Sequence, residues 1–93
     1  SQYAATKAAM TGMVRSWAIE LAPAGITANI VAPAATETAM LTAPGRDGAA
    51  PRMPPMGRFI RAEEVAAGVA YLVSPAAAPV TGQTLTLCGG ASL

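Results

Sequence analysis

The run ITANIVAP, residues 26–33, places the strongest constraint on the fold of this 93-residue chain. It is short, almost wholly apolar and closed by Pro33, which predicts a strand buried on both faces. Such strands lie inside parallel sheets and need a hydrogen-bonding partner on each side. A helical pattern precedes the run. Together they predict the second half of a β-α-β unit, whose first strand is not among these residues.

Large apolar side chains recur at helical spacing between residues 3 and 22, which predicts an amphipathic helix. They are Met10, Met13, Val14, Trp17 and Leu21. A second stripe of small residues on this helix would let another helix approach closely. It consists of Ala5, Ala9, Gly12 and Ser16. Pro23 and Gly25 predict the end of the helix.

The rest of the chain predicts a loop, a second helix and a second strand. Residues 34–57 show no clear periodicity, which is typical of a substrate-covering loop or of a segment that is disordered without its neighbours. Residues 61–75 predict a helix, with Glu63 and Glu64 favourably placed near its N-terminal dipole. Residues 80–90 predict a turn at Gly82, followed by a strand of alternating Thr and Leu.

The amino-acid composition argues against several classes of function. The net charge is +1, with six basic and five acidic residues, and gives no electrostatic footprint for nucleic acid. One cysteine and no histidine exclude disulfide frameworks, most zinc sites and a hydrolase that would activate Ser1 or Cys88 through a histidine base. The same cysteine usage favours a reducing cytoplasm.

The balance of apolar and charged residues predicts burial against another surface. Hydrophobic residues make up 53% of the chain and charged residues only 12%, whereas about 25% charged is typical of soluble domains. No stretch approaches the ~20 continuous apolar residues of a membrane span, and no secretory leader is recognisable. We therefore expect no membrane partner, and we expect a homo-oligomer that forms through the two helices.

Tyr3 and Lys7 are the strongest candidates for chemistry. They are four residues apart, so a helix places them on one face. A positive charge beside a phenol favours the phenolate, which suits a tyrosine that gives a proton to a carbonyl oxygen or takes one from an alcohol. The alternative is a half-buried aromatic residue beside a solvated lysine, and the pair alone does not distinguish the two.

The order of the motifs, across essentially all 93 residues, resembles the C-terminal part of the short-chain dehydrogenase/reductase family, particularly its ketoacyl-reductase-like members. YAATKAAMTGMVRSWAIELAPAGITANIVAP is similar to the family's Tyr-x-x-x-Lys helix and following strand. MGRFIRAEEVAAGVAYLVS and VTGQTLTLCGG are similar to its closing helix and strand. The resemblance implies an α/β chain in which residues 1–93 form the C-terminal part of a Rossmann-like doubly wound domain, in the order helix, strand, loop, helix, strand, incomplete as a single chain.

The resemblance also implies roles for individual residues in an NAD(P)-dependent oxidoreductase that acts on a small carbonyl or alcohol. Tyr3 would be the catalytic acid/base. Lys7 would tune it and hydrogen-bond the nicotinamide ribose of NAD or NADP. The segment from Pro33 to Thr38 would border the nicotinamide, with Thr36 in a backbone-contact position and Thr38 matching the family's threonine.

Departures from the family pattern limit this expectation. Ala34 stands where glycine is usual, Cys88 where aspartate is common, and Arg61 where a helix-capping residue is usual, so the second helix is expected to begin less sharply. No glycine-rich turn stands between a strand and a helix to receive the pyrophosphate, and the family's substrate-binding serine is missing. We therefore expect little or no activity and no bound cofactor for these residues alone. The competing hypothesis is a non-catalytic, homo-oligomeric assembly module.

Overall fold

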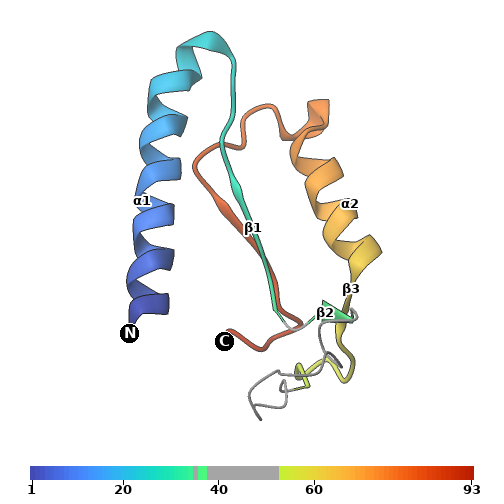
Figure 1. Cartoon of the computed structure of the whole chain (residues 1–93). Coiled ribbons are helices and arrows are strands. Elements are labelled where there is room, and N and C mark those ends of the chain that lie inside the picture. The colour runs from blue at the N-terminus through green and yellow to red at the C-terminus, as the bar shows by residue number, and fades with distance from the viewer. Residues whose placement is uncertain (35, 38–52) are drawn as a thin grey trace. The chain divides into compact units, whose positions relative to one another are not determined.

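Helix α1, Gln2–Leu21, is the first element of the computed structural model, which describes residues 1–34, 36–37 and 53–93 (Figure 1). The hydroxyl oxygen of Ser1 accepts a hydrogen bond from the Ala4 N–H at 3.2 Å and caps the helix start. The helix runs into the 3₁₀ turn η1, Ala22–Ala24, and ends at Gly25 with a φ of 75°. The predicted helix and its termination are confirmed.

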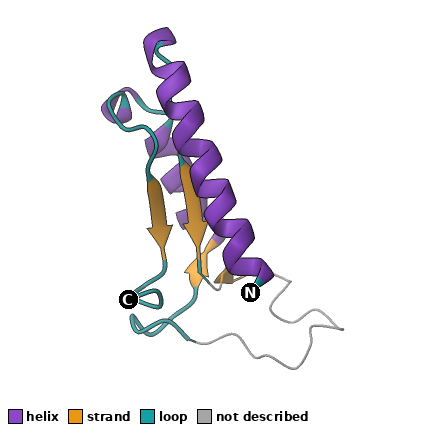
Figure 2. Ribbon diagram, turned by 90° about the vertical axis from the view of Figure 1, so that its left-hand side faces the viewer, coloured by secondary structure: helices purple, strands orange, loops and turns teal. Residues whose placement is uncertain are grey.

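Strands β1, Ile30–Pro33, and β4, Thr84–Leu87, lie side by side in a two-stranded sheet (Figure 2). The Ile30 N–H donates to the Gln83 carbonyl and the Ala34 N–H donates to the Leu87 carbonyl, both at 2.9 Å. Donors and acceptors advance together along the chain, so the two strands are parallel. This confirms the predicted parallel pairing of the apolar strand.

Strand β1 is shorter and less buried than the sequence predicted. The side-chain amide of Asn29 donates to the Val80 carbonyl and accepts from the Gln83 N–H, each at 3.0 Å. The neighbouring Ala28 donates its N–H to the Thr81 hydroxyl at 3.2 Å, and its carbonyl accepts from the Gly82 N–H at 2.8 Å, so residues 28 and 29 bond to the turn before β4 and not to a strand. The predicted burial on both faces is wrong for the described chain, because β1 pairs only with β4 there and its residues are half-buried, with Pro33 exposed.

The turn and alternation predicted for residues 80–90 are confirmed. Gly82 has a φ of 70°, a conformation that glycine adopts without strain. In β4 the two threonines are exposed and the two leucines are half-buried. The alternation follows from the two-residue period of a strand, which turns successive side chains to opposite faces.

The described chain divides into two compact units, residues 1–30 with 70–85 and residues 31–69 with 86–93. In the first unit, Val14 and Ala18 of α1 are buried. A Cβ built on Gly82 would stand 3.4 Å from the Ala18 Cβ. Small residues at both positions therefore allow α1 to approach the turn before β4 closely.

The large apolar stripe of α1 is buried only at Val14. Met10, Met13 and Trp17 keep exposed fractions of 45%, 50% and 47%. The described part of this unit contains no element that covers them. If α1 packs against another surface, as its sequence predicts, these three side chains are the ones we expect to become buried.

The second unit contains two short parallel strands that sequence patterns missed. Strand β2, Thr36–Glu37, pairs with β3, Ile60–Arg61, in the register Thr36 to Ile60 and Glu37 to Arg61. The expectation of a structureless stretch over residues 34–57 is therefore wrong at β2. Residues 38–52, where a substrate-covering loop was predicted, lie outside the described residues.

Helix α2, Ala62–Leu72, follows β3 directly and confirms the second predicted helix. The 3₁₀ turn η3, Pro75–Ala77, comes after it and buries Ala77. Ile60 of β3 is 4% exposed and is the most buried hydrophobic side chain described near the helix start. The junction between β3 and α2 is therefore well anchored.

Candidate functional site

Tyr3 and Lys7 lie on the first two turns of α1, on the same helical face. The Tyr3 side chain is 77% exposed, and Lys7 is exposed as well. Within the described residues, neither side chain makes a hydrogen bond or an ion pair.

Pro33 and Thr36 belong to the second unit, whereas Tyr3 and Lys7 belong to the first. Pro33 ends β1 and is exposed, and Thr36 is half-buried in β2. The Thr36 hydroxyl donates to the Ala34 carbonyl at 2.9 Å, which tightens the chain between the two strands. Thr38, the remaining candidate, lies outside the described residues.

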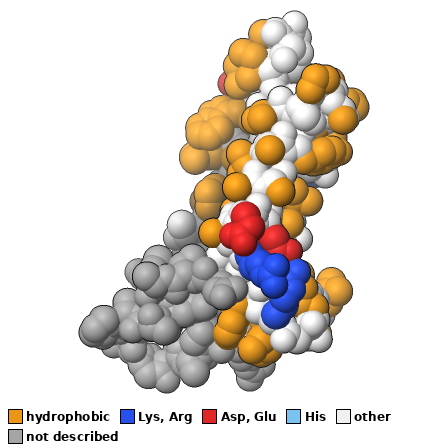
Figure 3. All heavy atoms as spheres, turned by 90° about the vertical axis from the view of Figure 1, so that its right-hand side faces the viewer, with side chains coloured by type: hydrophobic (Ala, Val, Ile, Leu, Met, Phe, Trp, Pro, Cys, Tyr) orange, Lys and Arg blue, Asp and Glu red, His pale blue; other side chains and the backbone are white. Residues whose placement is uncertain are grey.

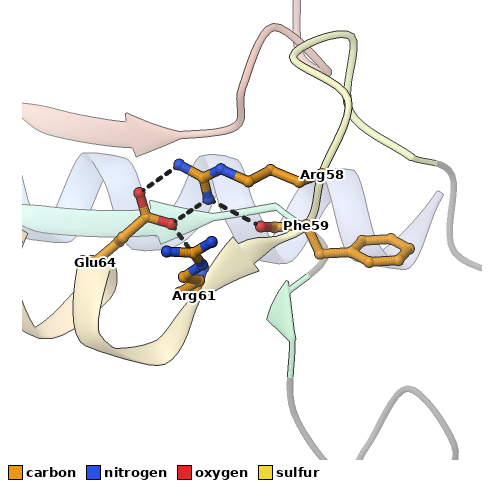
Figure 4. Close-up of polar contacts among 4 residues, drawn as sticks. All are labelled: Arg58, Phe59, Arg61 and Glu64. Atoms are coloured by element: carbon orange, nitrogen blue, oxygen red, sulfur yellow. Dashed lines mark hydrogen bonds and ion pairs between the residues drawn. The ribbon is translucent and has the colours of Figure 1, made fainter.

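A charged cluster stands at the start of α2, and we call it the Arg58–Glu64 clasp. The Arg58 guanidinium donates to both carboxylate oxygens of Glu64, at 2.6 and 2.9 Å, and to the Phe59 carbonyl at 3.2 Å (Figure 4). The Glu64 carboxylate also accepts from the Arg61 N–H at 2.9 Å. A two-pronged arginine–carboxylate contact fixes both partners in one geometry.

The clasp changes the electrostatics of the helix start. The Arg58 guanidinium, followed by the backbone N–H of Arg61, lowers the pKa of Glu64 from 4.5 to about 2. Figure 3 shows acidic and basic side chains gathered next to one another, with hydrophobic atoms around them. Glu64 therefore stays charged at all ordinary pH values.

The expectation that Arg61 leaves the start of α2 poorly defined is wrong. Arg61 occupies the position before the helix, and Glu64 is the third helical residue. A glutamate at this position can reach back to the N–H of the capping residue, which is one half of a capping box. The sequence contains this signal in the spacing of Arg61 and Glu64, but the other half, a serine or threonine, is missing.

Cys88, which stands where aspartate is common in the family, has a defined hydrogen-bonding environment just after β4. The thiol is half-buried and accepts a hydrogen bond from the Ser92 hydroxyl at 3.0 Å. This bond is the largest cause that lowers the pKa of Cys88 from 9.0 to about 7. In the sequence, only the four-residue spacing of Cys88 and Ser92 indicates this hydrogen bond, and the spacing matches no recognised motif.

Two kinds of site are not found in the described part of the chain. None of its helices is long and apolar enough to cross a membrane. None of its His, Cys, Asp or Glu residues form a group of three or more that could hold a metal ion.

Comparison with known protein families gives a match over residues 1–92 to the family model described as enoyl-(acyl carrier protein) reductase. The chain is 43% identical over 93 residues to a 3-oxoacyl-acyl-carrier-protein reductase of Thermotoga maritima, covering 97% of this chain and 37% of the relative. It is 45% identical over 92 residues to the reductase of the same description from Escherichia coli K12, covering 97% and 38%.

The chain is also similar to solved structures of related proteins. A short-chain dehydrogenase of Burkholderia cenocepacia in complex with NADP matches with a TM-score of 0.81 and 42% identity, over 98% of this chain and 38% of that chain. A 3-ketoacyl-acyl-carrier-protein reductase of Brucella melitensis complexed with NADH matches with a TM-score of 0.80 and 35% identity, over 98% and 37%.

The chain belongs to the short-chain dehydrogenase/reductase family, and within it resembles the ketoacyl reductases. It has the α/β fold of these neighbours. The chain spans 37% and 38% of the length of the two curated relatives described above.

The described residues include groups that suit the nicotinamide end of a dinucleotide, but they include no glycine turn that suits its pyrophosphate. An exposed phenol and ammonium on one helical face can meet a ribose and a carbonyl group. A pyrophosphate needs backbone N–H groups at a helix start that follows a strand and a glycine turn. The described glycines with positive φ are Gly25, Gly57, Gly82, Gly89 and Gly90. None of them stands between a strand and a following helix.

Proposed function

We propose that residues 1–93 supply the C-terminal part of an NAD(P)-dependent, Rossmann-like oxidoreductase domain that reduces a carbonyl group or oxidises an alcohol. The observation that carries this proposal is the exposed Tyr3 hydroxyl with Lys7 one helical turn away, in a chain of this family. A 3-oxoacyl thioester is the substrate we favour, because the relatives of Thermotoga maritima and Escherichia coli are 3-oxoacyl-acyl-carrier-protein reductases.

In this proposal Tyr3 moves the proton. Its hydroxyl gives a proton to the carbonyl oxygen during reduction, and its phenolate oxygen takes one from the alcohol during oxidation. Lys7 lies on the same helical face, where its ammonium would attract the negative charge that develops on the Tyr3 oxygen as the proton leaves. Both groups can act without breaking an existing bond, since neither has a partner among the described residues.

The residues that would hold the nicotinamide end of NAD or NADP are Lys7, Tyr3 and the segment from Pro33 to Thr38. The nicotinamide, when bound, supplies or accepts the hydride. Lys7 would donate a hydrogen bond to the ribose, and Thr36 would border the ring through its backbone. The two relatives of known structure were solved with NADP and NADH respectively.

The pyrophosphate and adenosine contacts would come from a nucleotide-binding part that residues 1–93 do not supply. These residues alone are therefore expected to show little or no turnover, and weak cofactor binding at most. A reducing cytoplasm remains the compartment predicted from the single cysteine.

The experiment compares the 93-residue chain with a completed domain. In the completed domain, this chain replaces the corresponding residues of the Thermotoga maritima reductase, to which it is 43% identical. Consumption of NADPH with a 3-oxoacyl thioester is followed by absorbance. We expect turnover from the completed domain and none from the chain alone.

Two results would contradict the proposal. Robust turnover by the chain alone would show that the nucleotide-binding part is not needed. A folded completed domain that binds NADPH but reduces no carbonyl substrate would show that Tyr3 and Lys7 do not perform this chemistry.

A second candidate is a homo-oligomeric assembly module, which is favoured by the exposed apolar side chains of α1. Met10, Met13 and Trp17 lie at helical spacing and remain about half exposed. Burying them against a second copy would remove apolar surface from water. Sedimentation at micromolar concentration tests this candidate: an oligomer that a Trp17→Ser substitution dissociates would support it, whereas a compact monomer would contradict it.

A further inference from the structure

The β2–β3 pair is too short to hold itself together. Each strand has two residues, Thr36–Glu37 and Ile60–Arg61. Even a complete two-stranded hairpin is only marginally stable in water, and a parallel pair has no tight turn to join its strands. Its position must therefore be fixed by contacts outside the ladder.

The Arg58–Glu64 clasp provides such contacts on both sides of Ile60. Before Ile60, the Arg58 guanidinium donates to the Phe59 carbonyl at 3.2 Å. After Ile60, the Glu64 carboxylate accepts from the Arg61 N–H at 2.9 Å. The two halves are joined by the ion pair at 2.6 Å, as Figure 4 shows. The backbone of residues 59–61 is thus tied at two points to the Arg58–Glu64 pair.

From these contacts we propose that Arg58 and Glu64 are positioning residues that hold Thr36–Glu37 in place through β3. Fixing residues 59–61 fixes the strand against which β2 pairs, in the register Thr36 to Ile60. The Thr36 hydroxyl then passes this constraint to the Ala34 carbonyl, 2.9 Å away, just beyond β1. The link to the cofactor rests on the proposed function, because there Thr36 borders the nicotinamide.

The test is site-resolved amide hydrogen exchange, measured by NMR on the full 93-residue chain. Arg58→Gln and Glu64→Ala should accelerate exchange at residues 36–37 and 60–61 about tenfold, because local opening becomes easier. The Ile30 and Ala34 amides, which donate to the carbonyls of Gln83 and Leu87, should change little.

Two further variants separate the clasp from simpler effects. Glu63→Ala removes the same charge from the same helical turn, so it reproduces any general effect on the helix dipole without touching the clasp. Arg58→Lys keeps the charge but loses the two-pronged contact, and it should give an intermediate acceleration. This milder variant also keeps the test valid if the stronger ones unfold.

Three exchange results would overturn the positioning role. The first is acceleration at residues 60–64 with residues 36–37 unchanged. The second is an equal acceleration in Glu63→Ala. The third is an absence of protection at residues 36–37 in the unsubstituted chain. Any of them would leave the chemistry proposed for Tyr3 untouched.

A second readout separates this inference from the proposed function. In the completed domain, Arg58→Gln should raise the dissociation constant of NADPH severalfold, measured by its fluorescence, and Glu63→Gln should not. If Arg58→Gln accelerates exchange at residues 36–37 but leaves the affinity for NADPH unchanged, the positioning of β2 is supported and the role of Thr36 at the nicotinamide is overturned. If Arg58→Gln changes both the exchange and the affinity, the whole inference is supported.

Discussion

A basic side chain lies near the start of each helix, but the two helix starts use it in opposite ways. At the start of α1, Tyr3 and Lys7 are exposed and have no partner among the described residues. At the start of α2, Arg58 and Glu64 bond to each other and to the backbone. Charge near a helix start thus serves chemistry in one place, in our proposal, and structure in the other.

The difference follows from what each helix needs at its first turn. The α1 start is capped by the Ser1 side chain, so its neighbours are not required for capping. The α2 start has arginine at the capping position, which cannot accept a hydrogen bond from the first helical N–H groups, and the Glu64 carboxylate is occupied by the Arg61 N–H. A group that satisfies the backbone is no longer available to a ligand.

The largest effect is expected from removing the Tyr3 hydroxyl, which tests whether the start of α1 serves chemistry. In the completed domain, Tyr3→Phe should lower kcat by about 10²- to 10⁴-fold, the range expected for losing a general acid. Tyr71→Phe is the matched control, because it removes the same hydroxyl from the other tyrosine of the chain. Steady-state kinetics checks both, and equal effects of the two substitutions would contradict the role of Tyr3.

A smaller effect is expected from Lys7. Lys7→Met should lower kcat/KM by about 10- to 100-fold, which corresponds to ~1.5–3 kcal/mol for a hydrogen bond to a charged group. Arg15→Met removes a cation from the same helix and serves as the control. Lys7→Met that matched Arg15→Met in its kinetics would show that only the overall charge of α1 matters.

The titration of Glu64 tests whether the start of α2 serves structure. Since the pKa of Glu64 is lowered from 4.5 to about 2, its stabilising contribution is complete above pH 4.5 and is lost as the pH falls from there through about 2. The NMR shift of the Arg61 amide should follow this titration. Glu64→Gln should abolish the transition and Glu63→Gln should keep it. A midpoint near 4.5 in the unsubstituted chain would show that the clasp does not form.

The smallest expected effect concerns Cys88, the other group whose pKa is lowered by a hydrogen bond. With a pKa of about 7, its thiolate is well populated at neutral pH. Ser92→Ala removes the donor, raises the pKa and should slow alkylation by iodoacetamide at pH 7 by about two- to fivefold. Ser74→Ala is the control, because the Ser74 hydroxyl donates to the Tyr71 carbonyl. Unchanged alkylation in Ser92→Ala would contradict the assigned cause.

Local sequence patterns predicted the long elements and missed the short ones. The helical spacing of apolar residues located the ends of α1 to within one residue and those of α2 to within three, since a long periodic segment repeats its signal. Strands β2 and β3 have two residues each, too few for any period to show. Their pairing joins positions 24 residues apart in the register Thr36 to Ile60, so only the folded chain reveals it.

The candidate site shows the same limit. Tyr3 and Lys7 could be placed on one face because their spacing matches the helix period. The clasp could not be foreseen from propensity alone, because Arg61 is a poor capping residue and the Glu64 carboxylate bonds both to its N–H and to the Arg58 guanidinium, six positions before Glu64. Likewise, Ala28 and Asn29 bond to residues more than 50 positions away instead of extending β1.

The solvent isotope effect on alcohol oxidation tests the central claim most directly. Single-turnover oxidation of a 3-hydroxyacyl thioester by NADP is measured in H₂O and in D₂O, for the completed domain and for its Tyr3→Phe variant. We predict that the unsubstituted domain reacts more slowly in D₂O, because the Tyr3 oxygen accepts the alcohol proton, and that the slow reaction of the variant lacks this effect. The same isotope effect in both proteins would contradict the claim that Tyr3 transfers the proton.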